Sequence, residues 1–286
     1  MEFVPFEFCA SVCSFLKNLG NLDVMCCANR NCDFWNAAIE MDFEKRQKIS
    51  LSVGYSVYGK GIGTWTYFIN NSPNVTFESC QAARENFRLE RITFRRCSYY
   101  NRSDLKTICK FASSCIYKTD LHIPQDFKKF PVNSHATIVG SYKGLSFRNI
   151  NIDCGKHELL KDFLIVQLNS HHLKEVTLTG KLSYGSCLKI QELVLRGTFH
   201  KLEFPRAYFD LKFFKKLFNK QLNGVKEFSF SAQSLCDRSS IRKFQKNCLI
   251  TFGTSQATWR RNDGVVATAK WYEQSGKVYS LKLTQD

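Results

Sequence analysis

Apolar and polar residues alternate in short runs along most of the chain, and one six-residue pattern recurs. In this hexad the first, fourth and sixth positions are apolar, and the fifth is usually small or polar. Alternation at the fourth and sixth positions is typical of a strand with one buried face. The copies are residues 89–94, 142–147, 173–178, 190–195 and 225–230. One copy cannot bury its apolar face alone, so we expect the copies to stack around one continuous core.

Apolar residues at three- and four-residue spacing predict amphipathic helices between the hexads. Asp104 is placed to cap one helix and Asp210 another. The apolar faces comprise Leu105, Ile108, Cys109, Ala112 and Ile116; Leu160, Phe163, Leu164 and Leu168; and Phe213, Phe214, Leu217, Phe218 and Leu222. The long gap after the first hexad leaves room for a further strand near residues 136–139. Alternating strands and helices favour parallel strands with right-handed crossovers, so we expect an irregular α/β solenoid.

The two ends of the chain depart from this pattern. Residues 3–48 carry helical spacing and are predicted to form a small head of short helices. From residue 49 the period becomes two, and residues 49–53 and 65–69 are predicted to pair as a hairpin around the glycine-rich turn 59–63. Residues 258–283 contain two turn signals, Asp263-Gly264 and Ser275-Gly276, and are predicted to form a β-meander that caps the last repeat.

The composition is that of a folded and basic protein. Apolar residues make up 44% of the 286 positions and aromatic residues 14%, which excludes a disordered chain. The 41 Lys and Arg outnumber the 25 Asp and Glu, and the net charge is +16. Such a charge suits nucleic acid, anionic lipid or an acidic protein. The basic residues are scattered, with no run longer than a doublet, so solvated faces are the alternative explanation.

Cysteine usage and the N-terminal residues indicate a compartment. The 13 cysteines include no C-x-x-C pair, their number is odd, and many lie in apolar runs. We therefore expect free thiols in a reducing environment, either cytoplasmic or nuclear. Glu2 and Glu7 accompany the apolar N-terminal run, which is the opposite charge to that of an export signal. No stretch approaches the roughly 20 apolar residues that a membrane-spanning helix needs, so no membrane association is expected.

Motifs for catalysis or metal binding are weak. The glycines at 59, 61 and 63 lack the spacing of a phosphate-binding loop. Cys26, Cys27 and Cys32 lack the second ligand pair of a typical zinc site. No nucleophile motif is present in the sequence. We therefore expect no enzyme, no cofactor and no metal. Basic residues beside aromatic ones, at 94–96 and 259–261, keep nucleic-acid binding open, although these aromatics equally suit a core.

The N-terminal segment and the hexads together resemble a known family. Val4-Pro5-Phe6-Glu7, Trp35 and Trp65, followed by the hexads, are similar to the nematode F-box and F-box-associated proteins with a degenerate leucine-rich-repeat-like domain. The resemblance implies a leucine-rich-repeat-like solenoid at residues 49–286 behind an F-box-like head at residues 1–48. The fold class that we predict is therefore α/β, with an irregular solenoid, a helical head and a C-terminal β-meander cap.

The resemblance also implies a function. The protein would be a non-enzymatic substrate receptor of a cullin–RING (SCF-type) ubiquitin ligase, with an unknown protein substrate held by the solenoid. The head would dock on a Skp-type adaptor through Pro5, Phe8, Val12, Leu16, Leu22, Trp35 and Ile39. Two alternatives stay open: a basic nucleic-acid-binding protein, and a stand-alone scaffold whose head only caps the solenoid.

Overall fold

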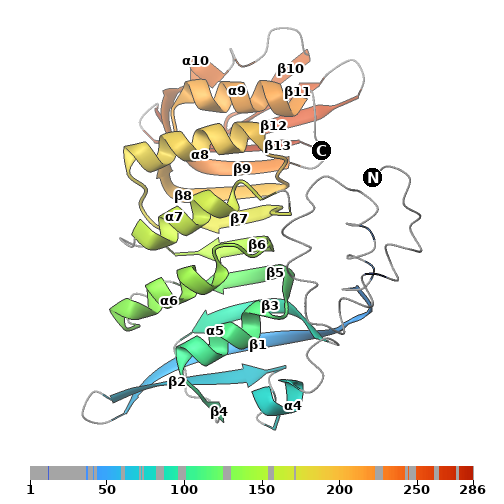
Figure 1. The fold of residues 1–286 in the computed structure, drawn as a ribbon. Helices are drawn as coiled ribbons and strands as arrows, with labels where there is room; N and C mark the ends of the chain where they lie inside the picture. The colour runs from blue at the N-terminus through green and yellow to red at the C-terminus, as the bar shows by residue number, and fades with distance from the viewer. Residues whose placement is uncertain are drawn as a thin grey trace. The chain divides into compact units, whose positions relative to one another are not determined.

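The computed structural model describes residues 12, 37, 41, 44–58, 62–70, 72, 74–81, 87–95, 101–124, 130–153, 158–170, 172–222, 228–241, 244, 249–260, 264–274 and 277–285. Over these residues the protein is mixed α/β, and thirteen strands belong to one sheet (Figure 1). The chain divides into two compact units. The first comprises Met1–Thr119 with Gly140–Leu145, and the second comprises Asp120–Val139 with Ser146–Asp286.

The first unit is built on a hairpin whose first strand also pairs with a later one. β1 (Gln47–Tyr58) pairs antiparallel with β2 (Ile62–Ile69) and parallel with β3 (Phe87–Arg95). The buried residues of β1 and β3 meet as Ile49–Leu89, Leu51–Ile92 and Val53–Phe94. The short elements α4 (Phe77–Gln81) and β4 (Asn101–Arg102) complete this part. The two strands of the predicted hairpin and the strand at hexad 89–94 are confirmed. Of the predicted turn, residues 59–61 lie outside the described residues, and residues 62 and 63 already belong to β2.

The helix α5 (Leu105–Ser113) begins at its predicted cap. Asp104 Oδ1 accepts a hydrogen bond from the Thr107 amide at 2.9 Å, and Oδ2 accepts one from the Thr107 hydroxyl at 2.5 Å. The bond from the Thr107 side chain, followed by the bond from its amide, lowers the pKa of Asp104. The helix is shorter than predicted, since Ile116 already begins β5 (Ile116–Ile123).

The second unit contains parallel strands joined by helices. The strands β6 (Phe147–Ile152), β7 (Glu175–Leu178), β8 (Lys201–Tyr208) and β9 (Phe228–Asp237) follow one another in the sheet as they do in the chain. The connecting helices are α7 (Glu158–Gln167), α8 (Tyr184–Arg196) and α9 (Leu211–Leu222). All three lie on the same face of these strands (Figure 1). The predicted alternation of parallel strands and helices is therefore confirmed for this unit.

A regular repeat runs through these strands. Ile150 pairs with Val176, Val176 with Leu202, and Leu202 with Phe230, at separations of 26, 26 and 28 residues. Each of the first three strands carries the apolar positions of a hexad, and all of these side chains are at most 2% exposed. They are Phe147, Ile150 and Ile152; Leu173, Val176 and Leu178; and Phe199, Leu202 and Phe204. Hexad 173–178 is thus confirmed, and its first residue folds back into the core from a turn.

The hexad at 190–195 is wrong as a strand, because these residues lie in α8. Helical spacing buries Cys187, Ile190 and Val194 on one face of that helix. Ser183 caps it by accepting a hydrogen bond from the Ser186 amide at 3.2 Å. The strand of this repeat is β8, which follows the helix.

Two further strand predictions are wrong, because both overlap the helix α6 (Val132–Tyr142). Residues 136–139 lie inside α6, where Ile138, Val139 and Tyr142 are buried at helical spacing. Hexad 142–147 begins at the last residue of this helix and reaches the strand β6 only at Phe147. The additional strand in this part of the chain is β5. For hexad 225–230, β9 begins at Phe228, and residues 223–227 lie outside the described residues.

The C-terminal strands form the predicted meander. The order is β10 (Leu249–Phe252), β11 (Gln256–Arg260), β12 (Val266–Gln274) and β13 (Lys277–Gln285), with antiparallel pairing throughout. β13 then pairs antiparallel with β9, so the meander continues the sheet beyond the parallel strands. The short helix α10 (Arg238–Ile241) follows β9. Gly264, in the predicted turn between β11 and β12, has a positive φ of 90°, which glycine adopts without strain.

An aromatic cluster joins α9 to the meander on the helix-covered face. Trp259 of β11 is fully buried, and its ring lies 4.7 Å from that of Phe218 and 6.0 Å from that of Phe244. Its cross-strand neighbour is Ala267, and Ala257 faces Ala269. These small side chains leave room for the indole ring. The cluster fixes one face of the meander and leaves the other for polar residues.

Candidate functional site

The residues predicted to dock on an adaptor lie almost entirely outside the described part of the chain. Val12 is the exception, and it is helical and half-buried. The six that fall outside are Pro5, Phe8, Leu16, Leu22, Trp35 and Ile39. That these side chains form one docking face therefore stays a prediction.

A different set of side chains is brought together on the sheet face opposite α7, α8 and α9 (Figure 1). Directly opposed residues of neighbouring strands point to the same side, so strand pairing defines rows of side chains on this face, and two of these rows contain the exposed lysines and tyrosines. The first row includes Thr177, Glu203, Ser231, Lys282, Lys270 and Gln256. The second row is Tyr208, Gln233 and Tyr272. We call these nine residues the open face.

The sequence forms this face because its residues alternate with buried ones. Thr177 lies between Val176 and Leu178, and Lys282 lies between Leu281 and Leu283, all four of which are buried. None of the nine residues is buried, and the connecting helices α7, α8 and α9 lie on the other face of the strands. The open face is therefore a polar surface on a rigid sheet whose other face forms the core.

Glu203 is compensated by its neighbours at the parallel end of the first row. Lys201 Nζ lies 3.2 Å from Glu203 Oε1, and the Thr177 hydroxyl donates a hydrogen bond of 3.1 Å to Glu203 Oε2. One carboxylate thus has both a cation and a hydroxyl donor within reach. Exposed contacts of this kind contribute only about 0–1 kcal/mol, but they hold the side chains in place.

In contrast to Glu203, Lys270 and Lys282 are not compensated by an opposite charge among the described residues. They are directly opposed across β12 and β13, both are exposed, and neither makes an ion pair with a carboxylate of the described residues. Like charges that face each other across two strands destabilise a sheet. Two unit charges about 6 Å apart in water repel by about 0.7 kcal/mol, which sets the scale for this pair. Their local field attracts an anion.

Two exposed tyrosines lie in the second row of the open face, and Tyr272 is the one beside the lysine pair. Tyr208 is 51% exposed and Tyr272 is 63% exposed, which is high for side chains of this size. Tyr272 is two residues from Lys270 on the same strand and therefore on the same face. Exposed tyrosines offer both apolar contact area and a hydroxyl, and for this reason they are enriched in interfaces.

The lysine pair depends on an irregularity in strand pairing that the sequence pattern does not show. Gln274 pairs with Lys277 and Glu273 with Val278, but the register shifts between Glu273 and Tyr272, which pairs with Ser280. Without the shift, the outward Lys270 would face the inward Leu281. The sequence pattern predicts both strands but not this register. The alternation of polar and apolar residues does predict that Lys270 and Lys282 lie on the polar sides of their strands.

Other reactive groups in the described residues have structural explanations. Cys80, Cys109, Cys115 and Cys187 are buried and form no disulfide, and burial of Cys109 and Cys115 was expected from the apolar runs in which they lie. Burial raises the pKa of Cys109 to about 11, so this thiol is protonated and unreactive at neutral pH. No group of three or more His, Cys, Asp or Glu side chains within the described ranges is arranged to hold a metal ion.

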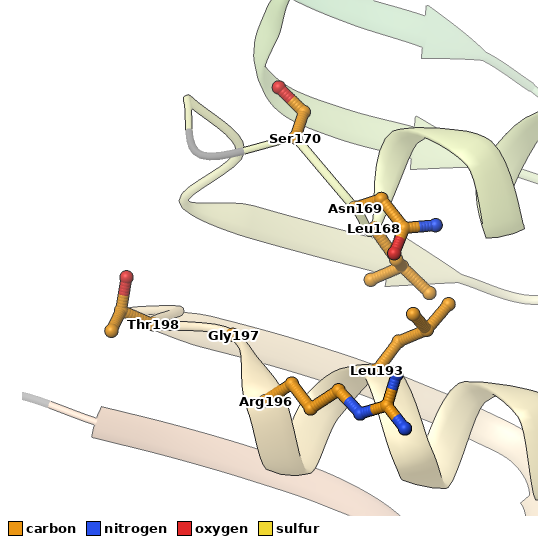
Figure 2. Close-up of a pocket in the computed structure, with 7 residues that line it drawn as sticks. All are labelled: Leu168, Asn169, Ser170, Leu193, Arg196, Gly197 and Thr198. Carbon is orange, nitrogen blue, oxygen red and sulfur yellow. The ribbon is translucent and has the colours of Figure 1, made fainter. Parts of the chain in front are cut away.

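A pocket of about 230 Å³ lies between the C-terminal ends of α7 and α8 (Figure 2). Leu168 and Leu193 contribute apolar surface, and Asn169, Ser170 and Thr198 contribute polar groups. Its remaining lining residues are Arg196 and Gly197. A side chain at Gly197 would overlap the ring of Phe199, so close packing requires glycine there. The pocket is smaller than the roughly 300–1,000 Å³ of typical ligand sites. Arg196 lies in the last turn of α8, where its positive charge offsets the helix dipole, so its position has a structural explanation.

Comparisons of the chain with family models, curated proteins and solved structures find no match. The helices of the described residues include none that is both long and apolar enough to span a membrane. The open face is the candidate site, and its role is inferred from its geometry alone.

Proposed function

We propose that this protein is a non-enzymatic recognition module that holds a protein partner on the open face. The observation that carries the proposal is the open face itself: nine polar or aromatic side chains on a sheet whose other face is anchored in the core. A broad surface of this kind is suited to a macromolecule, whereas small molecules bind in enclosed pockets.

The repeat supports a leucine-rich-repeat-like solenoid as the finer description of the fold. Paired core residues recur at 26, 26 and 28 residues, within the 20–29 residues of a leucine-rich repeat. The hexads match the first half of that motif, and the helices lie on one face of the strands (Figure 1). In this proposal the part of the open face on β7, β8 and β9 corresponds to the binding face of the repeats, and the meander extends that face at their C-terminal end.

We further propose that the module is the substrate receptor of a cullin–RING (SCF-type) ubiquitin ligase. The support is the resemblance of residues 1–48 to an F-box. The head would bind a Skp-type adaptor, and the open face would hold the substrate. Bringing substrate and ubiquitin donor together raises their effective concentration, so the protein needs no catalytic group of its own.

The ligase proposal is tested by co-purification of the full chain with a Skp-type adaptor. We expect the wild-type chain to retain the adaptor, and Leu16→Asp and Trp35→Ala to lose it without a change in far-UV circular dichroism. If the wild-type chain never retains the adaptor, the ligase role is wrong. If both substitutions unfold the chain, the head is a cap and the stand-alone scaffold is favoured.

A nucleic-acid-binding function is the second candidate, favoured by Lys270, Lys282 and the exposed Tyr272 beside them. Binding through phosphates would weaken steeply with salt, in proportion to the number of phosphates that are neutralised. Titration of a single-stranded oligonucleotide at several salt concentrations tests this candidate. Binding that weakens steeply with salt supports it, whereas no binding at low salt makes it wrong.

A further inference from the structure

We propose that the open face binds an acidic peptide segment, with the Lys270–Lys282 pair as its anchor and Tyr272 as its apolar contact. The inference rests on the proposed recognition function and names the chemistry of the partner. The partner is a segment in which a carboxylate lies beside an apolar or hydroxyl-bearing side chain.

Charge complementarity is the first argument. The two lysines are directly opposed, exposed and without an ion-pair partner in the described residues. In the free protein their ammonium groups repel each other. A carboxylate placed between them would offset this repulsion, because it is attracted to both ammonium groups at once.

The surroundings of the pair supply hydrogen-bonding groups for a peptide. Ser231 is opposed to Lys282, and Gln256 is opposed to Lys270. Their hydroxyl and amide groups donate to a carboxylate or to peptide carbonyls. Tyr272, two residues along β12, offers an aromatic ring to the next side chain of the bound segment.

A peptide suits the face better than a nucleic acid does. Among the nine residues of the open face the cations are Lys270 and Lys282, and the neighbouring Lys201 is already paired with Glu203, whereas a nucleic-acid backbone carries a phosphate at every nucleotide. Glu203 belongs to the same row as Lys282, separated from it by Ser231 alone. A phosphate backbone running along this row would meet that carboxylate. A peptide with one or two acidic residues can avoid it.

The test uses the full chain and fluorescence anisotropy with labelled probes. One peptide alternates Glu and Thr, a second alternates Gln and Thr, and a third alternates Lys and Thr. The fourth probe is oligothymidylate. We expect the Glu peptide to bind most tightly. Lys270→Gln with Lys282→Gln should weaken this binding about tenfold, the effect of two exposed ion pairs. Tyr272→Ala should weaken it severalfold and Tyr272→Phe much less.

The matched control removes the same charge from the opposite face. Lys212 and Lys216 are exposed on α9, and Lys212→Gln with Lys216→Gln should leave binding of the Glu peptide unchanged. If this control weakens binding as much as the double substitution at Lys270 and Lys282, net charge explains the effect and the inference is wrong. It is also wrong if the Glu and Gln peptides bind equally, or if oligothymidylate binds more tightly than the Glu peptide.

Failure of the inference can be told apart from failure of the recognition function. Ser231→Arg places a bulky cation in the middle of the first row. If the Gln or Lys peptide binds best and Ser231→Arg abolishes that binding, the open face recognises peptides but not acidic ones. If no peptide binds and the adaptor is not retained, both the inference and the proposed function are wrong.

Discussion

Reversing one charge of the lysine pair should stabilise the protein, although most surface substitutions are neutral. In Lys282→Glu, the repulsion of about 0.7 kcal/mol between residues 270 and 282 is replaced by an attraction of similar size. Screening at physiological salt reduces the sum, so we expect a net gain of about 0.5–1 kcal/mol in the free energy of unfolding. Lys270→Glu should give a similar gain, because the two positions are opposed in the sheet.

The assay is urea unfolding followed by far-UV circular dichroism at low and high salt. The double variant Lys270→Glu with Lys282→Glu restores a like-charge pair, so its stability should return to about the wild-type value. This cycle separates the pairwise effect from the change in net charge. At about 1 M salt the gain of each single variant should disappear. Single variants that are no more stable than wild type, or a double variant that sums both gains, would refute the pairing of these lysines.

Three further predictions concern the packing and capping of the fold. Trp259→Ala should cost about 3–5 kcal/mol in urea unfolding, whereas Trp259→Phe should be nearly neutral. The buried Trp259 Nε1 has no hydrogen-bond partner among the described residues, so removing this unsatisfied donor offsets the packing lost with the smaller ring. A decrease of more than about 2 kcal/mol in the free energy of unfolding of Trp259→Phe would contradict this reasoning. Asp104→Ala should cost about 1 kcal/mol through loss of the α5 cap, measured in the same way, with Ser103→Ala as the control. Because its folded pKa is lowered, Asp104 contributes stability above its unfolded pKa of about 3.9 and loses it as pH falls through the folded value; the variant should show a weaker loss on acidification, and an unchanged pH profile would argue against the cap. Cys109 should resist iodoacetamide at neutral pH until the protein unfolds, which mass spectrometry would detect; rapid labelling of the folded chain would contradict its burial.

Much of the fold could be predicted from local patterns, because capping and alternation are local signals. Asp104 lies where a cap was expected, and hexad 173–178 forms a buried strand with its turn. The hexad at 190–195 failed because its apolar residues also satisfy the helical spacing that continues from Cys187. A six-residue pattern does not separate the two periods, and the cap at Ser183 decides the outcome.

The candidate site could be predicted only in part, because it depends on long-range pairing. Alternation places Lys270 and Lys282 on polar sides, but their opposition follows from the register shift in the β12–β13 hairpin. Tyr208 reaches the second row through a similar shift between Phe204 and Tyr208 in the pairing of β8 with β9. Such shifts relieve local backbone geometry, and residue types alone do not place them.

The near-constant spacing of the parallel strands makes the energetics of this region quasi-one-dimensional. Each of β7 and β8 contacts the strand before it and the strand after it, so its stability is the sum of its own folding and two neighbouring interfaces. Adding or removing one whole repeat changes the number of interfaces without changing their kind. The length of the recognition surface can therefore vary in steps of one strand while the chemistry of each step is kept.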